Sequence, residues 1–369
     1  MVLYRKYRPK NFAEVVGQEH VVETLQGAIQ TGRLAHAYLF TGPRGTGKTS
    51  MARLLAKAVN CEKSNGQADA CAVCHFCQEV EEGRAVDLIE IDAASNRGID
   101  DIRALREGAR FSSMNAGKYK VYVIDECHQL SKDASNALLK TLEEPPAKTL
   151  FVLATTEPHK VLPTIVSRVQ KFDFKKLNTN QIISKLHRIA LAEKVKIEKD
   201  LLRLIARQAE GSLRDAESNF AKLIAFTVPA GRQEGQTIHE EAVKEVLGII
   251  PLNFYYDFFR LVQDKKKAEA LSLVGQIYES GLDLENFTKG LLDYSRRVLV
   301  ARANPADVNA FSADLGEDSA QKIASLARDI DGKGILKLIS ALMRAQQDFK
   351  ISPIPQLPLE IAVSELTEM

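Results

Sequence analysis

The sequence lacks several features that mark particular classes of protein. No apolar run approaches the roughly 18 residues that a membrane-spanning helix needs, and the basic N-terminal segment lacks the apolar core of a signal peptide. There is no internal repeat and no low-complexity tail. The chain has 50 Lys and Arg against 48 Asp and Glu, a net charge of +2. This net charge does not indicate a nucleic-acid binder. It does not exclude one either, because a basic face could be balanced by an acidic face elsewhere. We expect a globular, cytoplasmic protein.

Cysteine is also scarce, but its distribution is uneven. Four of the five cysteines follow the pattern Cys61-x9-Cys71-x2-Cys74-x2-Cys77, and such clustering in a cytosolic chain favours a metal over disulfides. Four thiolates suffice for one tetrahedral Zn²⁺ with no open position, which predicts a structural ion. Iron–sulfur ligation also uses clustered cysteines, but nothing else indicates redox chemistry, so we favour zinc. We expect the fifth, Cys127, to face the core.

The pattern of apolar residues predicts an α/β fold followed by helical regions. Short apolar runs that read as buried parallel strands occupy residues 37–42, 87–92, 120–126 and 150–156. Helical periodicity fills the stretches between them, as in an α/β domain with a parallel sheet. From about residue 178 to about 248, and again from 251 to the end, everything reads as helical.

One glycine-rich segment fits the phosphate-loop pattern G-x4-G-K-[ST] between a predicted strand and a predicted helix. Its glycines allow backbone N–H groups to curl around phosphate oxygens, and the helix N-terminus favours the same anion. Lys48 can reach the β- and γ-phosphates, and Thr49 can offer a hydroxyl to Mg²⁺. The expected nucleotide-binding residues are Gly42, Pro43, Arg44, Gly45, Thr46, Gly47, Lys48, Thr49 and Ser50.

A second signal is the strand at 120–126, which ends in two carboxylates that would be costly to bury without a role. Asp125 would hold Mg²⁺, and Glu126 would activate the attacking water as general base. Cys127 and His128 complete an Asp-Glu-Cys-His sequence that also resembles a motif of superfamily 2 helicases, which keeps that enzyme class open as an alternative. A helicase would need a second sheet-containing domain after residue 178.

These residues together resemble one known family, the AAA+ ATPase subunits (tau/gamma) of bacterial DNA polymerase III clamp loaders. The resemblance is dense over residues 1–220 and weak after 248. Besides the phosphate loop and cysteines, it rests on Arg8-Pro9, Phe12-x2-Val15-Val16-Gly17-Gln18, Asp92-Ala93-Ala94-Ser95, Asn136 to Pro146, Ala154-Thr155-Thr156, Ser167-Arg168 and Gly211-Ser212-Leu213-Arg214-Asp215.

The resemblance implies an α/β AAA+ P-loop ATPase core with a parallel sheet at 1–177, carrying a zinc insert at 61–77. A helical lid at 178–248 and an all-α oligomerisation collar at 249–369 would follow.

It also implies residue roles around ATP. Thr156 would sense the γ-phosphate or the attacking water, with Thr155 one residue away. Arg214 would reach the γ-phosphate from a lid helix, where we expect Ser212 as N-cap and Asp215 to complete a capping box. Arg168 would be an arginine finger for ATP bound in a neighbouring subunit.

The implied function is an ATP-hydrolysing clamp-loader subunit that uses ATP and Mg²⁺ and loads a sliding clamp onto primer–template DNA. Its partners would be other loader subunits, the clamp and DNA. Arg103 and Lys140 are candidates for phosphate-backbone contacts, while the basic N-terminal segment would lie near the adenine pocket. A catalytically silent stator of the same assembly is the alternative, although such a subunit should lack Lys48.

Overall fold

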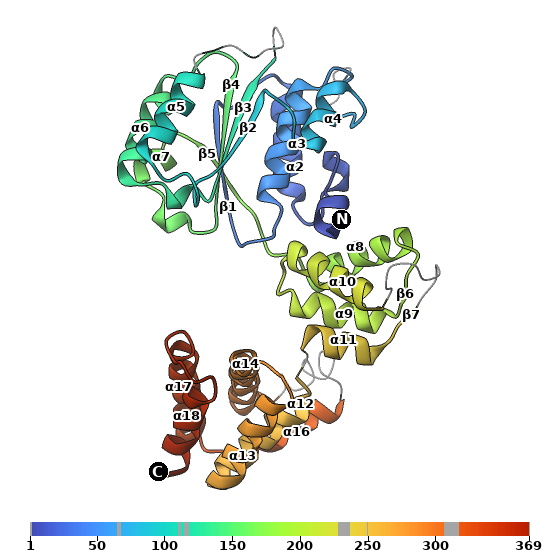
Figure 1. Ribbon diagram of the computed structural model, residues 1–369, viewed down its shortest axis with the longest axis vertical. Helices are drawn as coiled ribbons and strands as arrows, with labels where there is room; N and C mark the ends of the chain where they lie inside the picture. The colour runs from blue at the N-terminus through green and yellow to red at the C-terminus, as the bar shows by residue number, and fades with distance from the viewer. Residues whose placement is uncertain are drawn as a thin grey trace. The chain divides into compact units, whose positions relative to one another are not determined.

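The computed structural model describes residues 2–64, 68–109, 111, 113, 118–227, 237–248, 250–305 and 317–368. They form two compact units, Met1–Val243 and Lys244–Met369, shown in Figure 1. Both the predicted core (1–177) and most of the predicted lid (178–248) fall within the first unit. None of the described helices is long and apolar enough to cross a membrane.

The first unit is built on a five-stranded sheet in the order β2-β3-β4-β1-β5, with every neighbouring pair parallel. Its strands are β1 (Ala37–Thr41), β2 (Leu88–Asp92), β3 (Lys120–Asp125), β4 (Thr149–Thr155) and β5 (Gln170–Asp173). The predicted α/β architecture with a parallel sheet is therefore confirmed. β5 was not predicted from the sequence, because this edge strand buries only Phe172 and carries no apolar run.

Helices cover both faces of this sheet (Figure 1). Tyr38 and Phe40 of β1 pack into one apolar cluster, while the alternating Ala37 and Leu39 pack into another, as the two-residue period of a strand requires. The first cluster lies under α2 (Glu19–Gln30) and α3 (Lys48–Asn60), and the second under α5 (Ile99–Ala109), α6 (Lys132–Glu143) and α7 (Pro163–Val166). Burial on both faces explains why the central strands read as continuous apolar runs.

The segment after the sheet is mainly helical. It contains α8 (Thr179–Ala192), α9 (Lys199–Gln208), α10 (Leu213–Thr227) and α11 (Glu240–Leu247). The expectation that everything here is helical is wrong in one detail, since β6 (Lys196–Ile197) and β7 (Thr237–Ile238) pair in parallel. Strands of two residues are too short to produce a readable alternation.

The described part of the second unit is all helical. Its helices are α12 (Leu252–Gln263), α13 (Lys267–Glu279), α14 (Leu284–Ala303), α16 (Glu317–Asp329), α17 (Gly332–Asp348) and α18 (Leu357–Glu368). Their core is rich in aromatic side chains: Tyr255 stacks on Phe287 with ring centroids 5.4 Å apart, and Phe258 meets the same ring edge-on at 5.9 Å. Such pairs add to the stabilisation from area burial alone.

Candidate nucleotide and metal sites

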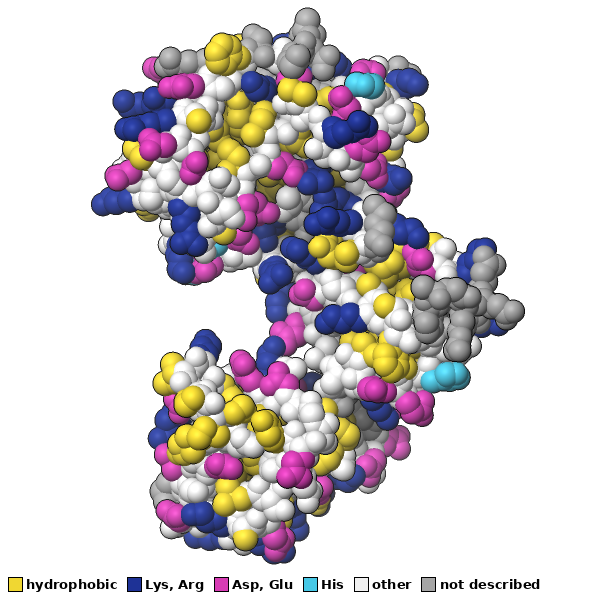
Figure 2. Space-filling view, in the orientation of Figure 1, with side chains coloured by type: hydrophobic (Ala, Val, Ile, Leu, Met, Phe, Trp, Pro, Cys, Tyr) yellow, Lys and Arg dark blue, Asp and Glu magenta, His cyan; other side chains and the backbone are white. Residues whose placement is uncertain are grey.

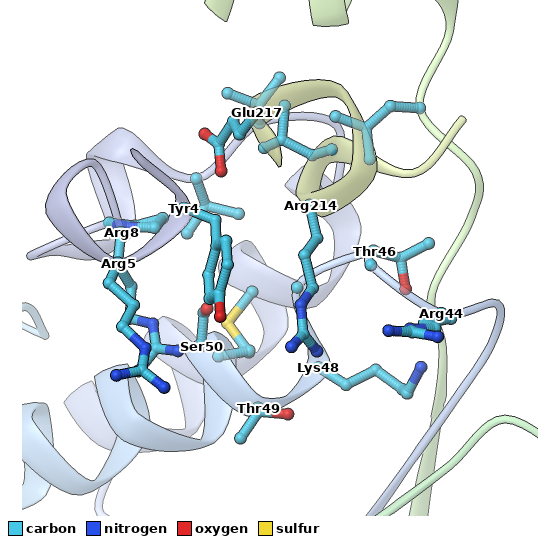
Figure 3. Close-up of a pocket in the computed structure, with 18 of the residues that line it drawn as sticks. Tyr4, Arg5, Arg8, Arg44, Thr46, Lys48, Thr49, Ser50, Arg214 and Glu217 are labelled. Carbon is cyan, nitrogen blue, oxygen red and sulfur yellow. The ribbon is translucent and has the colours of Figure 1, made fainter. Parts of the chain in front are cut away.

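A pocket of about 280 Å³ opens in the first unit where several segments of the chain meet (Figure 3). Residues 44–50 of the phosphate loop, with Asp125 and Glu126, line one part of it. Residues of the N-terminal segment, including Tyr4 and Arg8, and of α10 line the rest. The carboxyl ends of β1 and β3 lead into this pocket, which is where parallel α/β sheets bind ligands.

The phosphate loop joins β1 to α3 through a backbone that only glycine adopts easily. Gly42, Gly45 and Gly47 have φ of +139°, +75° and +99°. A Cβ on Gly45 would lie 2.0 Å from the Ser212 Oγ, so glycine here also permits the close approach of the lid.

Lys48 is 6% exposed and lies at the base of the loop. Its Nζ donates hydrogen bonds to the carbonyl oxygens of Gly42, at 2.7 Å, and Pro43, at 2.8 Å. Burial lowers the pKa of this amine, and the carboxylates of Glu126 and Asp125 act in the opposite direction. Gly42 and Pro43, both expected to bind nucleotide, thus position the lysine through their carbonyl groups and do not line the described pocket.

The Thr49 hydroxyl donates a 2.8 Å hydrogen bond to the Asp125 Oδ2. The side chains that we predict to share Mg²⁺ therefore converge although 76 residues separate them. A hydroxyl and a carboxylate are the hard oxygen ligands that Mg²⁺ prefers, so this pair fits the predicted role.

Glu126 follows β3 in a left-handed conformation, with φ of +47°. This conformation costs a non-glycine residue free energy of about 1–3 kcal/mol, and strained residues of this kind cluster at active sites. The Glu126 Oε2 accepts hydrogen bonds from the Thr156 hydroxyl at 2.9 Å and the Thr156 backbone N–H at 3.2 Å. Thr155 instead contacts the His128 Nδ1 at 2.9 Å, so of the two threonines only Thr156 engages the predicted general base.

The start of α10 brings Arg214 over the pocket. The Leu213 N–H donates to the Gly45 carbonyl at 3.1 Å, and the Arg214 guanidinium lies 4.9 Å from the centre of the Tyr4 ring (Figure 3), within reach of a cation–π contact. The Ser212 Oγ accepts from the Asp215 N–H at 3.2 Å, as predicted for an N-cap. The predicted reciprocal half of the capping box is wrong, because the Ser212 N–H donates to the Ala209 carbonyl at 2.8 Å.

Tyr4 and Glu217 line the pocket but were not predicted from the sequence, and Glu217 is 5% exposed. Burial raises its pKa to about 7, against the opposing charges of Lys185 and Arg8. Its position three residues after Arg214 was the available signal, since residues i and i+3 share a helix face.

The four clustered cysteines converge on one point beside α3. Cys61 ends α3, Cys74 is the N-cap of α4 (His75–Glu82), and Cys77 lies in the first turn of α4. All four Sγ atoms lie within 4.8 Å of one another, which is close to the spacing of about 3.8 Å that a tetrahedron with 2.3 Å Zn–S bonds requires.

Backbone groups already point at these sulfurs. The Cys71 N–H donates to the Cys61 Sγ at 3.3 Å, and the Cys74 N–H donates to the Cys71 Sγ at 3.2 Å. Burial acts to raise the pKa of the Cys71 thiol, but hydrogen bonds from the Val73 and Cys74 backbone lower it to about 6. A preformed group of four thiols fits a metal cation, and the four cysteines could hold one.

Comparison with known families accounts for nearly the whole chain. A model described as "DNA polymerase III, delta subunit" matches residues 17–178. One described as "DNA polymerase III clamp loader subunit, ATPase lid domain" matches 181–227. One described as "DNA polymerase III subunits gamma and tau domain III" matches 238–368.

Individual relatives agree with these models. DNA polymerase III subunit tau of Bacillus subtilis is 37% identical over 366 residues, covering 99% of this chain and 63% of that protein. The tau subunit of Escherichia coli is 39% identical over 365 residues, covering 98% of this chain and 54% of that protein. The chain belongs to the tau/gamma family of DNA polymerase III subunits. It thus spans between half and two thirds of the length of these tau subunits.

Membership of the tau/gamma family agrees with the parallel five-stranded sheet and the phosphate loop after β1. Among solved structures, Thermotoga maritima RuvB has a TM-score of 0.48 and 19% identity, covering 69% of this chain and 79% of that one.

The remaining predicted site residues of this tau/gamma chain lie on its surface. Arg168 follows α7 and is not among the described residues that line the nucleotide pocket. Its Nε donates a hydrogen bond to the Glu143 Oε1 at 3.0 Å, and its Nη1 donates one to the Thr164 carbonyl oxygen at 2.8 Å. Arg103 on α5 and Lys140 on α6 are exposed, and Arg103 pairs with Asp100 at 3.1 Å.

Proposed function

We propose that the chain is an ATP-hydrolysing motor subunit of a DNA polymerase III clamp loader, which opens a sliding clamp and loads it onto primer–template DNA. The observation that carries the proposal is that Lys48, Asp125 and Glu126 line a single pocket, with Thr156 hydrogen-bonded to the Glu126 carboxylate. Family membership supports it, since the lid model that matches this chain is described as a clamp-loader ATPase lid.

In the proposed reaction, the phosphate loop and Lys48 bind the triphosphate, and Arg214 contacts it from the lid. A water oxygen bonds to the γ-phosphorus while the bond to the β–γ bridging oxygen breaks, which yields ADP and phosphate. Glu126 takes the proton of the water, and Thr156 orients the Glu126 carboxylate. Thr49 and Asp125 would hold Mg²⁺, which when bound neutralises charge on the phosphates.

We propose further that Arg168 acts in a neighbouring subunit. Its place outside the pocket of its own chain supports this role, because a finger supplied in trans must be reachable by a neighbouring subunit, and the Arg168 side chain is 35% exposed. In the isolated chain its charge is held by Glu143, and this pair would have to exchange for the γ-phosphate on assembly. Hydrolysis would then depend on oligomerisation.

Oligomerisation is proposed to use the second unit. Leu336 and Met343 lie seven residues apart on α17, hence on one face, and are 56% and 54% exposed. Ile351 and Ile354 follow them and are 82% and 50% exposed. Figure 2 shows hydrophobic side chains on the surface of this unit, and exposed apolar surface of this kind marks interfaces.

DNA contact is proposed for Arg103 and Lys140, whose helices pack side by side on one face of the sheet. Such contacts to phosphates would be salt-sensitive and independent of sequence. Replacing both residues by Ala should reduce the slope of log affinity against log salt concentration by roughly 2, since each phosphate contact contributes about 0.9. An unchanged slope would remove both residues from the DNA surface.

The two alternatives make different predictions. A superfamily 2 helicase would carry a second sheet-containing domain after residue 178, but the described residues from 178 to 368 contain only the two-residue strands β6 and β7. A silent stator would not need the contacts made by Lys48 and Glu126.

The deciding experiment measures ATP binding and ATPase rate in the assembled loader, with and without clamp and primed DNA. Clamp and primed DNA should raise the rate, Lys48→Ala should abolish nucleotide binding, and Lys132→Ala, which removes an exposed lysine of α6, should change neither. A wild-type subunit that binds no ATP would refute the motor role.

A further inference from the structure

The nucleotide pocket contains an acidic residue to which the proposed hydrolysis gives no task. Asp125 and Glu126 stand at the end of β3, near the phosphate loop. Among the described lining residues, the third acidic group is Glu217 on α10, and Figure 3 shows its carboxylate turned into the pocket on the side of Tyr4 and Arg8. Glu217 therefore belongs to the part of the pocket formed by the N-terminal segment and the lid.

The side chains that line this part of the pocket suit a nucleobase. Its lining includes the apolar side chains of Pro9, Val15, Val16, Leu177 and Leu213. Small-molecule sites typically combine mostly apolar walls with a few placed polar groups that fix orientation. The apolar walls suit a flat ring, and Glu217 supplies a hydrogen-bonding group at their edge.

Burying this carboxylate costs free energy that the fold does not fully recover. Its charged neighbours are Lys185 of α8 and Arg8 of the N-terminal segment. However, the Lys185 Nζ also donates a hydrogen bond to the Tyr7 carbonyl oxygen at 3.0 Å. The Lys185 amine therefore divides its interactions between Tyr7 and Glu217. A group that is costly to bury and that faces a ligand pocket is a candidate for ligand recognition.

We infer that Glu217 determines nucleobase specificity by accepting a hydrogen bond from the exocyclic 6-amino group of adenine. A carboxyl oxygen accepts from an N–H whether or not the other oxygen carries a proton, so the contact exists in both protonation states. The inference rests on the proposed binding of ATP in this pocket and adds to it the residue that selects the base.

The competing explanation is purely structural, with Glu217 serving only to balance the charges of Lys185 and Arg8. The two explanations predict different changes in nucleotide affinity when the base is altered. A structural role would affect all nucleotides equally, whereas a base contact would affect nucleotides differently according to the group at position 6 of the purine.

The test measures equilibrium binding of three nucleotides to the full chain: ATP, GTP and purine riboside triphosphate, which has hydrogen in place of the 6-amino group. Wild type should prefer ATP over purine riboside triphosphate by about 10-fold, the equivalent of one hydrogen bond to a charged or polar group. Glu217→Leu should bring this ratio close to 1. Glu217→Gln should keep it, because the amide oxygen still accepts, and the exposed lid substitution Glu198→Gln is the control.

Other results of these binding measurements would contradict either the inference or the proposed function. An unchanged ratio in Glu217→Leu, or a ratio near 1 in wild type, would overturn the inference while leaving ATP binding intact, and the wild-type measurement holds even if Glu217→Leu fails to fold. A wild-type preference for GTP over ATP would also overturn it. Failure of wild type to bind any of the three nucleotides would instead refute the proposed function itself.

Discussion

The Thr156 hydroxyl donates a 2.9 Å hydrogen bond to the Glu126 carboxylate, and the Thr156 backbone N–H adds a second bond to the same oxygen at 3.2 Å. These residues end neighbouring strands, since β3 and β4 pair in parallel and finish at the same edge of the sheet. The sheet register thus fixes the orientation of the carboxylate that we propose as general base.

This relationship predicts a split between binding and hydrolysis. Glu126→Gln should leave ATP binding intact and lower the ATPase rate of the assembly by roughly 10²–10⁴-fold, the usual contribution of a positioned general base. Thr156→Val should cause a smaller loss of about 10-fold, since it removes one hydrogen bond that orients Glu126. Thr156→Ser retains the hydroxyl and should recover most of the rate; equal losses in Ser and Val would contradict the orienting role.

Arg168 and Glu143 allow the trans-finger proposal to be tested against a matched control. Arg168→Ala should leave ATP binding unchanged and reduce hydrolysis by roughly 10³-fold or more, but only in the assembled loader. Glu143→Gln breaks the same ion pair while keeping the guanidinium, so its rate should stay near wild type. If the isolated chain hydrolysed ATP at the full assembly rate, Arg168 would not act in trans.

The cysteine cluster predicts bound zinc in a molar ratio near one per chain, measured by elemental analysis of the purified protein. Cys74→Ser should lower the zinc content and the melting temperature, because a structural ion contributes folding free energy. Cys127→Ala should retain the zinc, since Cys127 is buried in a separate apolar cluster under α6. Iron in place of zinc would support the iron–sulfur alternative.

Substitution of Gly45 tests whether ATP binding depends on the close contact between the phosphate loop and the lid. In Gly45→Ala the new Cβ would meet the Ser212 Oγ at 2.0 Å with φ at +75°, so the Ser212 side chain must move and release its cap on the start of α10, and ATP affinity should fall at least 10-fold. Gly27→Ala, in α2 with no atom within 4 Å of its Cβ, should gain about 0.5–1 kcal/mol of stability and keep normal affinity. Equal affinities in the two variants would show that the lid tolerates displacement.

Glu217 predicts a pH dependence of stability in the nucleotide-free chain. Its pKa of about 7 in the folded state exceeds the ordinary value of 4.5, so the native state holds the proton longer than the unfolded state. Stability therefore falls as pH rises from about 4.5 to about 7. The melting temperature of Glu217→Gln relative to wild type should rise over this range, while that of Glu198→Gln should not; a flat difference for Glu217→Gln would contradict the raised pKa.

The sequence by itself determined the features that depend on local patterns. Buried parallel strands are continuous apolar runs, so β1, β3 and β4 could be predicted, while the partly buried edge strand β2 was readable from Leu88, Ile89 and Ile91. The phosphate loop was readable because its glycines are required by backbone conformation. The cysteine spacing likewise indicated a metal site. These signals are local because each physical requirement falls on residues that are close in sequence. The requirement is burial for the strands, positive φ for the phosphate loop, and the number of ligands for the cysteines.

Tertiary structure decided what depends on residues far apart in the chain. The edge strand β5 exposes three of its four residues, so its pairing with β1 left no apolar pattern. Only the fold distinguishes Thr156 from Thr155, because the choice depends on which hydroxyl faces Glu126. For Glu217 the sequence offers only its position three residues after Arg214; its place in the pocket arises from the packing of α10 against the N-terminal segment, which the helix sequence itself does not specify.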